Sequence, residues 1–260
     1  INAFSLGATT RNLGKMYYVA EPSGTTENAL YTVTLKDGTI IHVDLDRSES
    51  VRALFFQKKQ LYGVFYDGDL GTAGLYKIAR ATGVTTLVLD LSDLDLEPIP
   101  GAFTSFGDYY YMLAKPEIDS TQRRLLKFKT RAGSAKVLEV KDAAGLPVAC
   151  DKFKPNAARQ NFVCLASTNS ETQVDLYRLS LRGKATFVNT LPGILRVGGG
   201  HTLLTLDQNR YYAFVYVPDE PNNQRLIKFN SKGTVLSNLV LDRISIGGHF
   251  QSEIPVSARQ

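Results

Sequence analysis

A turn that contains glycine recurs through this chain at a nearly fixed interval. The glycines are Gly38, Gly83, Gly133, Gly183 and Gly233, so the interval is 45 residues once and 50 residues three times. An apolar pentad of similar composition precedes each turn, and a second β-prone run follows it. Two such runs around a short turn predict a β-hairpin, because glycine adopts positive φ angles without steric cost. A hairpin that returns five times predicts a repeat architecture.

Two further β-prone runs precede each hairpin, which gives four predicted strands per repeat. In the first repeat the predicted strands are 3–8, 15–20, 29–35 and 39–45. No helical period is sustained anywhere, so an all-β fold is expected. We interpret 1–260 as a single domain and 242–260 as a closing strand and tail. The approximate repeats are 1–48, 49–98, 99–145, 146–193 and 194–241.

Four-stranded units of this length are typical of a β-propeller. One such sheet cannot bury both of its apolar faces alone, whereas neighbouring blades cover them. A β-sandwich or a solenoid is the alternative, but a sandwich does not need an equal period. Residues 243–250 resemble 195–202, so we expect the C-terminal strand to join the first blade and close a ring of five. Six blades, the last one partial, remain the alternative.

Short motifs in the repeats resemble those of known propellers. The run Leu-Tyr-Lys-Ile-x-x-x-Thr-Gly at 75–83 is similar to motifs of the β-propeller superfamily, in particular the TolB-like and related propellers. The resemblance extends over almost the whole chain, although each motif is short and generic. The chain has no Trp, so the tryptophan–aspartate signature and the Trp-rich quinoprotein pattern are both missing. The resemblance therefore implies the fold and identifies no single family.

Charge and cysteine content bear on compartment and partners. The net charge of +5 is mildly basic and spread along the sequence, which favours acidic partners or surfaces. No run of about 18 apolar residues predicts a membrane span, and no motif predicts specific recognition of nucleic acid. Cys150 and Cys164 lie on adjacent predicted strands, where they form either a disulfide or two free, buried thiols. Because the chain begins without Met or a leader, we expect a removed signal peptide or a trimmed chain, and an extracellular or periplasmic monomer.

Two histidines suggest a site in the central channel. His201 and His249 are 48 residues apart, close to one period, and each follows glycines that would let a ligand approach the backbone. Imidazoles at one depth in adjacent blades could bind a divalent metal ion or act as a general base. Asp151 and Glu253 are the candidates for a further ligand. The alternative is that both histidines only cap inner strands.

Aromatic and basic residues suggest a binding surface instead. Tyr110 and Tyr211 lie on second strands, where their rings either stack on a sugar or protein partner or pack between blades. The densest basic stretch is 123–136, which could contact phosphate or acidic glycans. A basic outer hairpin also serves to block pairing between sheet edges.

Catalytic motifs are missing from the sequence. It contains no phosphate-binding loop, no Gly-x-Ser-x-Gly, no His-Glu-x-x-His and no Cys-x-x-Cys. We therefore predict a non-enzymatic binding or scaffold propeller that recognises a glycan or protein partner through loops and exposed aromatics, without a resident cofactor. The alternative is a hydrolase or lyase with a metal-assisted site in the channel.

Overall fold

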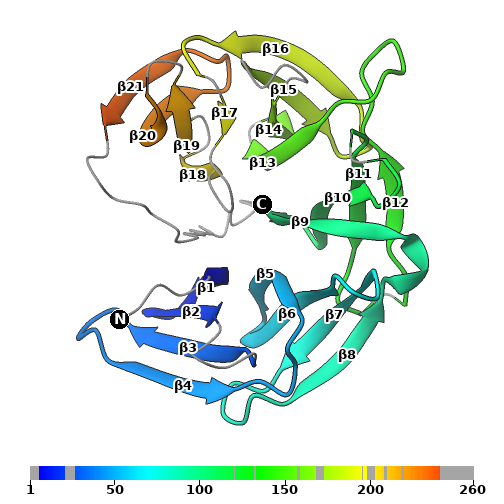
Figure 1. Ribbon diagram of the computed structural model, residues 1–260, viewed down its shortest axis with the longest axis vertical. Helices are drawn as coiled ribbons and strands as arrows, with labels where there is room; N and C mark the ends of the chain where they lie inside the picture. Colours follow the sequence, from blue (N-terminus) through cyan, green and yellow to red (C-terminus); the bar gives the residue numbers. More distant parts are fainter. Residues whose placement is uncertain are drawn as a thin grey trace.

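Five antiparallel sheets stand in a ring in the computed structural model (Figure 1). The sheets are the blades of a five-bladed β-propeller, which confirms the predicted fold class. The inner strands lie nearest the centre, and the outer strands run around the rim. The structure describes residues 6–20, 27–119, 121–131, 133–156, 159–167, 173–194, 196–197, 203–207, 210–217 and 220–240.

Each blade follows the chain outward from the centre. Blade 1 consists of β1 (Leu6–Asn12), β2 (Lys15–Ala20), β3 (Ala29–Thr34) and β4 (Ile40–Asp44). Blade 2 consists of β5 (Ser50–Gln57), β6 (Gln60–Asp67), β7 (Thr72–Ile78) and β8 (Thr85–Asp90). Blade 3 consists of β9 (Leu96–Phe106), β10 (Tyr109–Pro116), β11 (Arg124–Phe128) and β12 (Lys136–Glu139). Blade 4 consists of β13 (Cys150–Asn156), β14 (Asn161–Ser167), β15 (Val174–Ser180) and β16 (Ala185–Leu191).

Blade 5 has a divided inner position. Its strands β19 (Arg210–Val217), β20 (Glu220–Asn230) and β21 (Val235–Val240) pair in order, while β17 (Arg196–Val197) and β18 (Leu203–Asp207) both pair with β19. Of the inner strand that the sequence predicts at 195–201, the structure shows β17, whereas β18 was not predicted. Residues 198–202 and the predicted closing strand at 243–250 lie outside the described residues.

One predicted connection is in part a strand. The sequence indicates a surface connection at 90–100, because it carries acids and two prolines, but β9 already begins at Leu96. Leu96 and Pro98 are buried and pair with the end of β10. An inner strand has a neighbour on one side only, and proline is tolerated on such an edge strand. The two prolines are therefore compatible with a strand, and the prediction of a surface connection is wrong from Leu96 onward.

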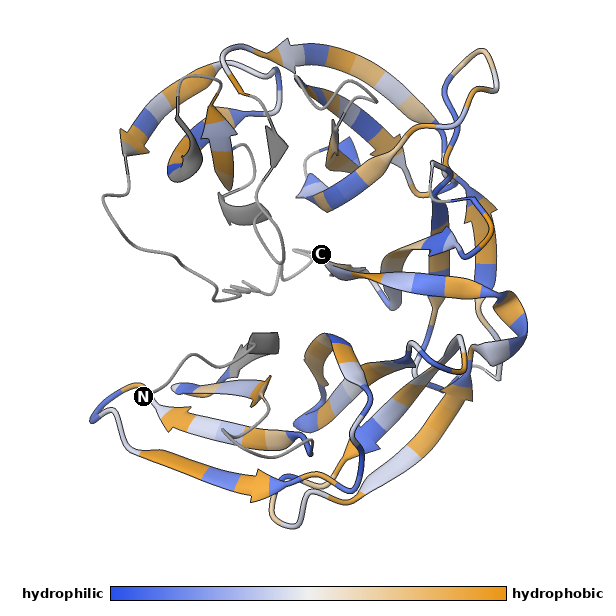
Figure 2. Cartoon of the chain, in the orientation of Figure 1, coloured by the Kyte–Doolittle hydropathy of each residue, from blue (hydrophilic) through white to orange (hydrophobic). Residues whose placement is uncertain are grey.

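Hydrophobic cores fill the space between consecutive blades. On β10, Tyr110 and Met112 pack against blade 2, whereas Tyr111 and Leu113 pack against blade 4. Burial on both faces explains why the strands read as nearly continuous apolar runs. The outer strands are largely exposed and carry scattered hydrophobic residues (Figure 2), such as Leu87.

A disulfide joins the two innermost strands of blade 4. Cys150 on β13 and Cys164 on β14 are bonded, and their Cα atoms are 6.0 Å apart. The predicted disulfide is therefore confirmed, and the alternative of two free thiols is wrong. As helical elements, the described part of the chain contains only short 3-10 turns such as Ser92–Leu94, and no helix there could span a bilayer.

Candidate functional site

The antiparallel order gives every blade two distinct ends. The turns between first and second strands and between third and fourth strands lie at one end, which we call the turn face. The second-to-third loops and the connections between blades lie at the other end, the connection face. Near the inner strands, contacts between blades join like ends: Thr130, between β11 and β12, donates a hydrogen bond to Gln57 at the end of β5. Likewise Arg80, between β7 and β8, donates to the hydroxyl of Tyr17 at 3.1 Å. At the rim, the connection end of an outer strand meets the third-to-fourth turn of the next blade, as Lys141 does by pairing with Lys184.

Cations dominate the turn face. Within the described turns the acids are Asp37 and Asp108, and Asp108 lies 4.0 Å from the ammonium group of Lys129. Basic residues come from the turns of all five blades. They are Lys36, Lys58, Lys59, Arg80, Lys129, Arg131, Arg159, Arg182, Lys184 and Lys232.

Acids dominate the connection face. Its described loops carry three cations, Arg47, Arg123 and Lys141. The acids there are Glu27, Asp46, Glu49, Asp69, Asp93, Asp95, Glu117, Asp119 and Asp142. The turns are therefore mainly basic and the connecting loops mainly acidic, a contrast that the modest net charge of +5 conceals. The two sets of loops meet at the rim, where Asp46 accepts from the backbone N–H of Thr85.

Hydrogen bonds keep representative carboxylates of both faces ionised. Bonds from the hydroxyl and the backbone N–H of Thr121 lower the pKa of Asp119. The backbone N–H of Thr39 lowers the pKa of Asp37 in the same way. A carboxylate that accepts such bonds keeps its negative charge at neutral pH.

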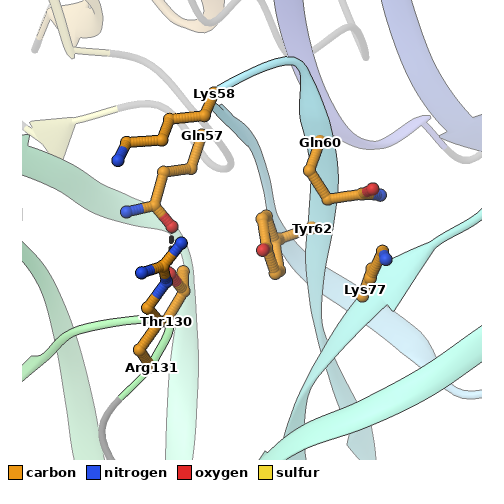
Figure 3. Close-up of a pocket in the computed structure, with 7 residues that line it drawn as sticks. All are labelled: Gln57, Lys58, Gln60, Tyr62, Lys77, Thr130 and Arg131. Atoms are coloured by element: carbon orange, nitrogen blue, oxygen red, sulfur yellow. Dashed lines mark hydrogen bonds between the residues drawn. The ribbon is translucent and has the colours of Figure 1, made fainter.

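A pocket opens on the turn face between blades 2 and 3 (Figure 3). Its volume is about 220 Å³, and its lining includes three cationic side chains and no acidic one. Small-molecule sites usually measure ~300–1,000 Å³, so this pocket suits one small group of a larger ligand. The lining residues are Gln57, Lys58, Gln60, Tyr62, Lys77, Thr130 and Arg131.

Hydrogen bonds orient the two amides of this pocket. The hydroxyl of Thr130 donates to the carbonyl oxygen of Gln57, so the Gln57 amide nitrogen is the group that can donate to a ligand. The amide nitrogen of Gln60 donates to the backbone oxygens of Leu61 and Ile78, at 3.2 and 2.9 Å. That arrangement leaves the Gln60 carbonyl oxygen as an acceptor.

The turn beside the pocket has an unfavourable backbone for its sequence. Lys58 and Lys59 are consecutive and both have positive φ, 46° and 70°. The equivalent turns in blades 1 and 3 each use a glycine, Gly14 (φ 75°) and Gly107 (φ 59°). The left-handed conformation costs a non-glycine residue ~1–2 kcal/mol, and Asn-Gly is the usual solution. Blade 2 instead places two cations there.

The pocket lies beside Gly133, which with Gly38 is one of two third-to-fourth turn glycines whose Cβ position is unobstructed. A Cβ on Gly83 would overlap the backbone oxygen of Asp44 in blade 1, and one on Gly183 would overlap that of Glu139 in blade 3. A Cβ on Gly133 would meet nothing within 4 Å. Its turn, 129–135, is the longest third-to-fourth turn of the five. The turn of blade 3 thus does not press its glycine against blade 2.

Asp151 is the predicted metal ligand that can be placed. It lies near the start of β13 on the connection face, where Arg123 donates to its carboxylate from Nη2 at 2.6 Å and from Nε at 3.0 Å. His201, His249 and Glu253 lie outside the described residues, so their roles remain predictions. Within the described ranges no three His, Cys, Asp or Glu residues gather as a metal site would require.

The predicted aromatic ligands are interior residues. Tyr110 is 7% exposed and Tyr211 is 0% exposed, and both pack in cores between blades. Their position on second strands explains this, because those strands are covered on both faces. The binding role predicted for these two rings is corrected to the packing alternative.

The basic stretch 123–136 is divided between the two faces. Arg123 and Arg124 lie at the connection end and pair with Asp151 and Glu139. At the turn end, Lys127 and Lys129 lie over the partly exposed ring of Tyr109, with Nζ 3.9 and 4.5 Å from its centroid. A hairpin that runs from one face to the other cannot form one continuous patch.

Two buried lysines join blades 3 and 4. Lys152 and Lys154 on β13 donate to the backbone oxygens of Pro100 and Phe103 on β9, at 2.9 and 3.3 Å. Burial lowers the pKa of Lys152 to about 8, against the opposing effect of Asp151. These lysines hydrogen-bond an inner strand that has no neighbouring strand on its central side.

The sequence interpretation missed the pocket residues. They come from three strands and two turns of two blades, with Gln57 and Thr130 separated by 73 positions. One local signal was available, namely two lysines in a hairpin turn where blades 1 and 3 carry glycine. The recurring glycine marks the third-to-fourth turns and not these first-to-second turns.

Comparison with known proteins identifies the fold alone. No family model and no curated protein matches the chain. Among solved structures, it is similar to the β-propeller domain of the trilobed protease from Pyrococcus furiosus, described as having an open velcro topology (TM-score 0.53, 10% identity, 94% of this chain and 72% of that one). It is also similar to a puromycin-hydrolysing peptidase from Mycobacterium tuberculosis (TM-score 0.54, 12% identity, 92% of this chain) and to acylaminoacyl peptidase from Pyrococcus horikoshii (TM-score 0.52, 11% identity, 90% of this chain). The chain spans 38% and 39% of these two peptidases.

Proposed function

We propose that this protein is a non-enzymatic binding propeller that recognises an acidic glycan through its turn face. The observation that carries the proposal is the separation of charge between the two faces. Cations project from the turns of every blade, while acids populate the opposite loops. Such a field attracts a polyanion to one end of the molecule and repels it from the other.

A glycan fits this surface better than a single acidic protein patch. The cations are distributed around the ring, so they suit a ligand that repeats its negative groups along an extended chain. Tyr109 offers a partly exposed ring flanked by two lysines, and the pocket between blades 2 and 3 combines a tyrosine with two amides. Aromatic faces next to hydrogen-bonding groups are suited to sugar rings.

The compartment proposal rests on the disulfide. A bonded Cys150–Cys164 pair fits an oxidising environment, and we propose that the protein acts as a monomer outside the cytosol or in a periplasm. Extracellular acidic polysaccharides would be available to it there.

The test measures binding of a sulfated and a carboxylated polysaccharide at 50 and 500 mM NaCl. We expect the dissociation constant to rise at least tenfold with salt, because exposed charges are screened. Arg182→Gln with Lys184→Gln removes two turn-face cations outside the pocket and should weaken binding about threefold to thirtyfold, at ~0.3–1 kcal/mol per charge. Lys115→Gln with Arg124→Gln is the control, since it removes the same charge at the connection ends of β10 and β11.

Three results would overturn the proposal. They are equal losses in the two double variants, binding that does not depend on salt, and tighter binding of polyglutamate or duplex DNA than of either polysaccharide. Polyglutamate would indicate an acidic protein partner, and DNA would indicate a nucleic acid.

A further inference from the structure

The pocket between blades 2 and 3 differs from the rest of the turn face because three cations from different elements line one cavity. Lys58 comes from the turn between β5 and β6, Lys77 from β7, and Arg131 from the turn between β11 and β12. Among the described residues no ion pair joins any of the three to an acid. We propose that this pocket binds one tetrahedral oxyanion, the sulfate ester or phosphate ester group of a ligand. The inference rests on the proposed function and specifies the group that is recognised.

The polar groups surround a common space. Figure 3 shows Gln57, Thr130 and Arg131 on one side, Gln60 and Lys77 on the other, and the ring of Tyr62 between them. The donors available are two ammonium groups, a guanidinium, a phenol hydroxyl and the Gln57 amide. An oxyanion with three terminal oxygens can accept several of these donors at once. Charge-assisted bonds of this kind are the strong ones, and the planar guanidinium can bind two oxygens together.

Unneutralised cations around one cavity repel one another in the absence of an anion. A bound oxyanion removes this repulsion and adds attraction to each cation, so its effect exceeds that of one surface ion pair. The neutral residues of the pocket are less exposed than its cations, since Gln57, Gln60 and Tyr62 are half-buried and Thr130 is buried, whereas Lys58, Lys77 and Arg131 are exposed.

The strained lysine turn supports a binding role independently of the charge count. Lys58 and Lys59 both keep a left-handed backbone that glycine or asparagine would adopt at lower cost. Residues held in such conformations cluster at binding sites, where the rest of the structure maintains them. In this turn the conformation places Lys58 at the pocket.

The experiment titrates the whole protein with inorganic phosphate and, separately, sulfate, at constant ionic strength balanced with NaCl. Backbone amide chemical shifts of 57–62 and 129–131 report the site. We expect saturable shifts confined to these segments and a dissociation constant in the millimolar range. Arg131→Gln and Lys77→Gln should each weaken binding at least fivefold. The matched controls Lys36→Gln and Lys232→Gln, which remove cations from other turns of the same face, should stay within twofold of wild type.

A second arm separates the two ligand sources. Glucose 6-sulfate and glucose 6-phosphate are titrated against wild type, and the tighter ligand identifies the ester class. Shifts that do not saturate, or equal losses in pocket and control variants, would overturn the oxyanion site. If the pocket binds phosphate but no polysaccharide binds the protein, the site stands and the proposed function fails. If polysaccharide binds and Arg131→Gln has no effect on it, the proposed function stands and the pocket inference fails.

Discussion

The junction between blades 2 and 3 differs from the junctions on either side of it. Between blades 1 and 2, and between blades 3 and 4, the glycine of a turn lies directly against a backbone oxygen of the preceding outer strand. Between blades 2 and 3 the turn is longer, a Cβ on Gly133 would meet nothing within 4 Å, and a basic pocket is present. One repeat pattern thus produces closed and open junctions in the same ring.

The opening is confined to one face. At the connection end of the same junction, Arg52 on β5 lies 3.4 Å from Glu97 on β9, and the hydroxyl of Tyr66 donates to Glu117 at 3.2 Å. The core between the two blades is continuous, with the ring centroids of Phe55 and Tyr110 at 4.4 Å. The difference teaches that a propeller can form a site by lengthening one outer turn while core and opposite face remain packed.

The largest expected effect comes from adding a Cβ at the closed junctions. Gly83→Ala and Gly183→Ala should each reduce the free energy of unfolding by about 3 kcal/mol or more. The left-handed backbone contributes ~1–2 kcal/mol and the overlap with a backbone oxygen adds a similar amount. The measurement is the midpoint of urea unfolding. Gly38→Ala is the matched control, because Gly38 also has a positive φ (73°) but a Cβ there would meet nothing within 4 Å, so it should lose only the ~1–2 kcal/mol of the backbone conformation. Gly133→Ala, at a glycine without positive φ, should change stability by less than about 0.5 kcal/mol. Equal damage in Gly38→Ala and the two junction variants would show that the overlap contributes nothing.

The second effect is a pH dependence of stability that arises from Lys152 at the closed junction between blades 3 and 4. Lys152 has a pKa of about 8 in the folded protein, against 10.5 for an ordinary lysine, because burial disfavours its charge. Between these values the unfolded chain binds more protons than the native one, so stability should rise with pH. The full gain is roughly 3 kcal/mol, complete near pH 10.5 and absent below pH 8.

The measurement compares wild type with Lys152→Met in urea from pH 7 to 10.5. Titrating groups other than Lys152 affect both proteins equally, so they cancel in the difference between the two unfolding free energies. We expect this difference to change by up to roughly 3 kcal/mol between pH 8 and pH 10.5. Parallel curves would mean that Lys152 does not titrate differently in the folded state. Asp151 and Lys154 are the neighbouring charges that act on it.

The smallest effect tests whether the Lys58–Lys59 turn at the open junction lowers stability while it supports binding. Lys58→Asn with Lys59→Gly installs the turn sequence that this backbone prefers, and we expect stability to rise by about 1 kcal/mol. For a chain of this size that corresponds to a Tm increase of roughly 2–4 °C. Binding of phosphate should weaken at least fivefold in the same variant. If the variant gains stability and binds phosphate as tightly as wild type, the turn does not contribute to the site.

The sequence by itself determined the ring of blades. Turn glycines at 45 and 50 residues, together with an aromatic residue on each second strand, predicted five sheets and most strand bounds. These features depend on local backbone preference and on burial of both sheet faces. Both are visible in the sequence of a single strand and its turn. The same period predicted the neighbouring strands that hold Cys150 and Cys164.

Only the tertiary structure decided the candidate site. Along the sequence acids and bases alternate, and the basic stretch 123–136 reads as one patch. Antiparallel strand order separates its arginines from its lysines and gathers the cations of successive blades at one end. The pocket joins Gln57 to Thr130 because the longest turn of blade 3 reaches blade 2. A local sequence pattern sets where a strand begins and ends. The pairing of strands and the packing of blades determine which side chains meet.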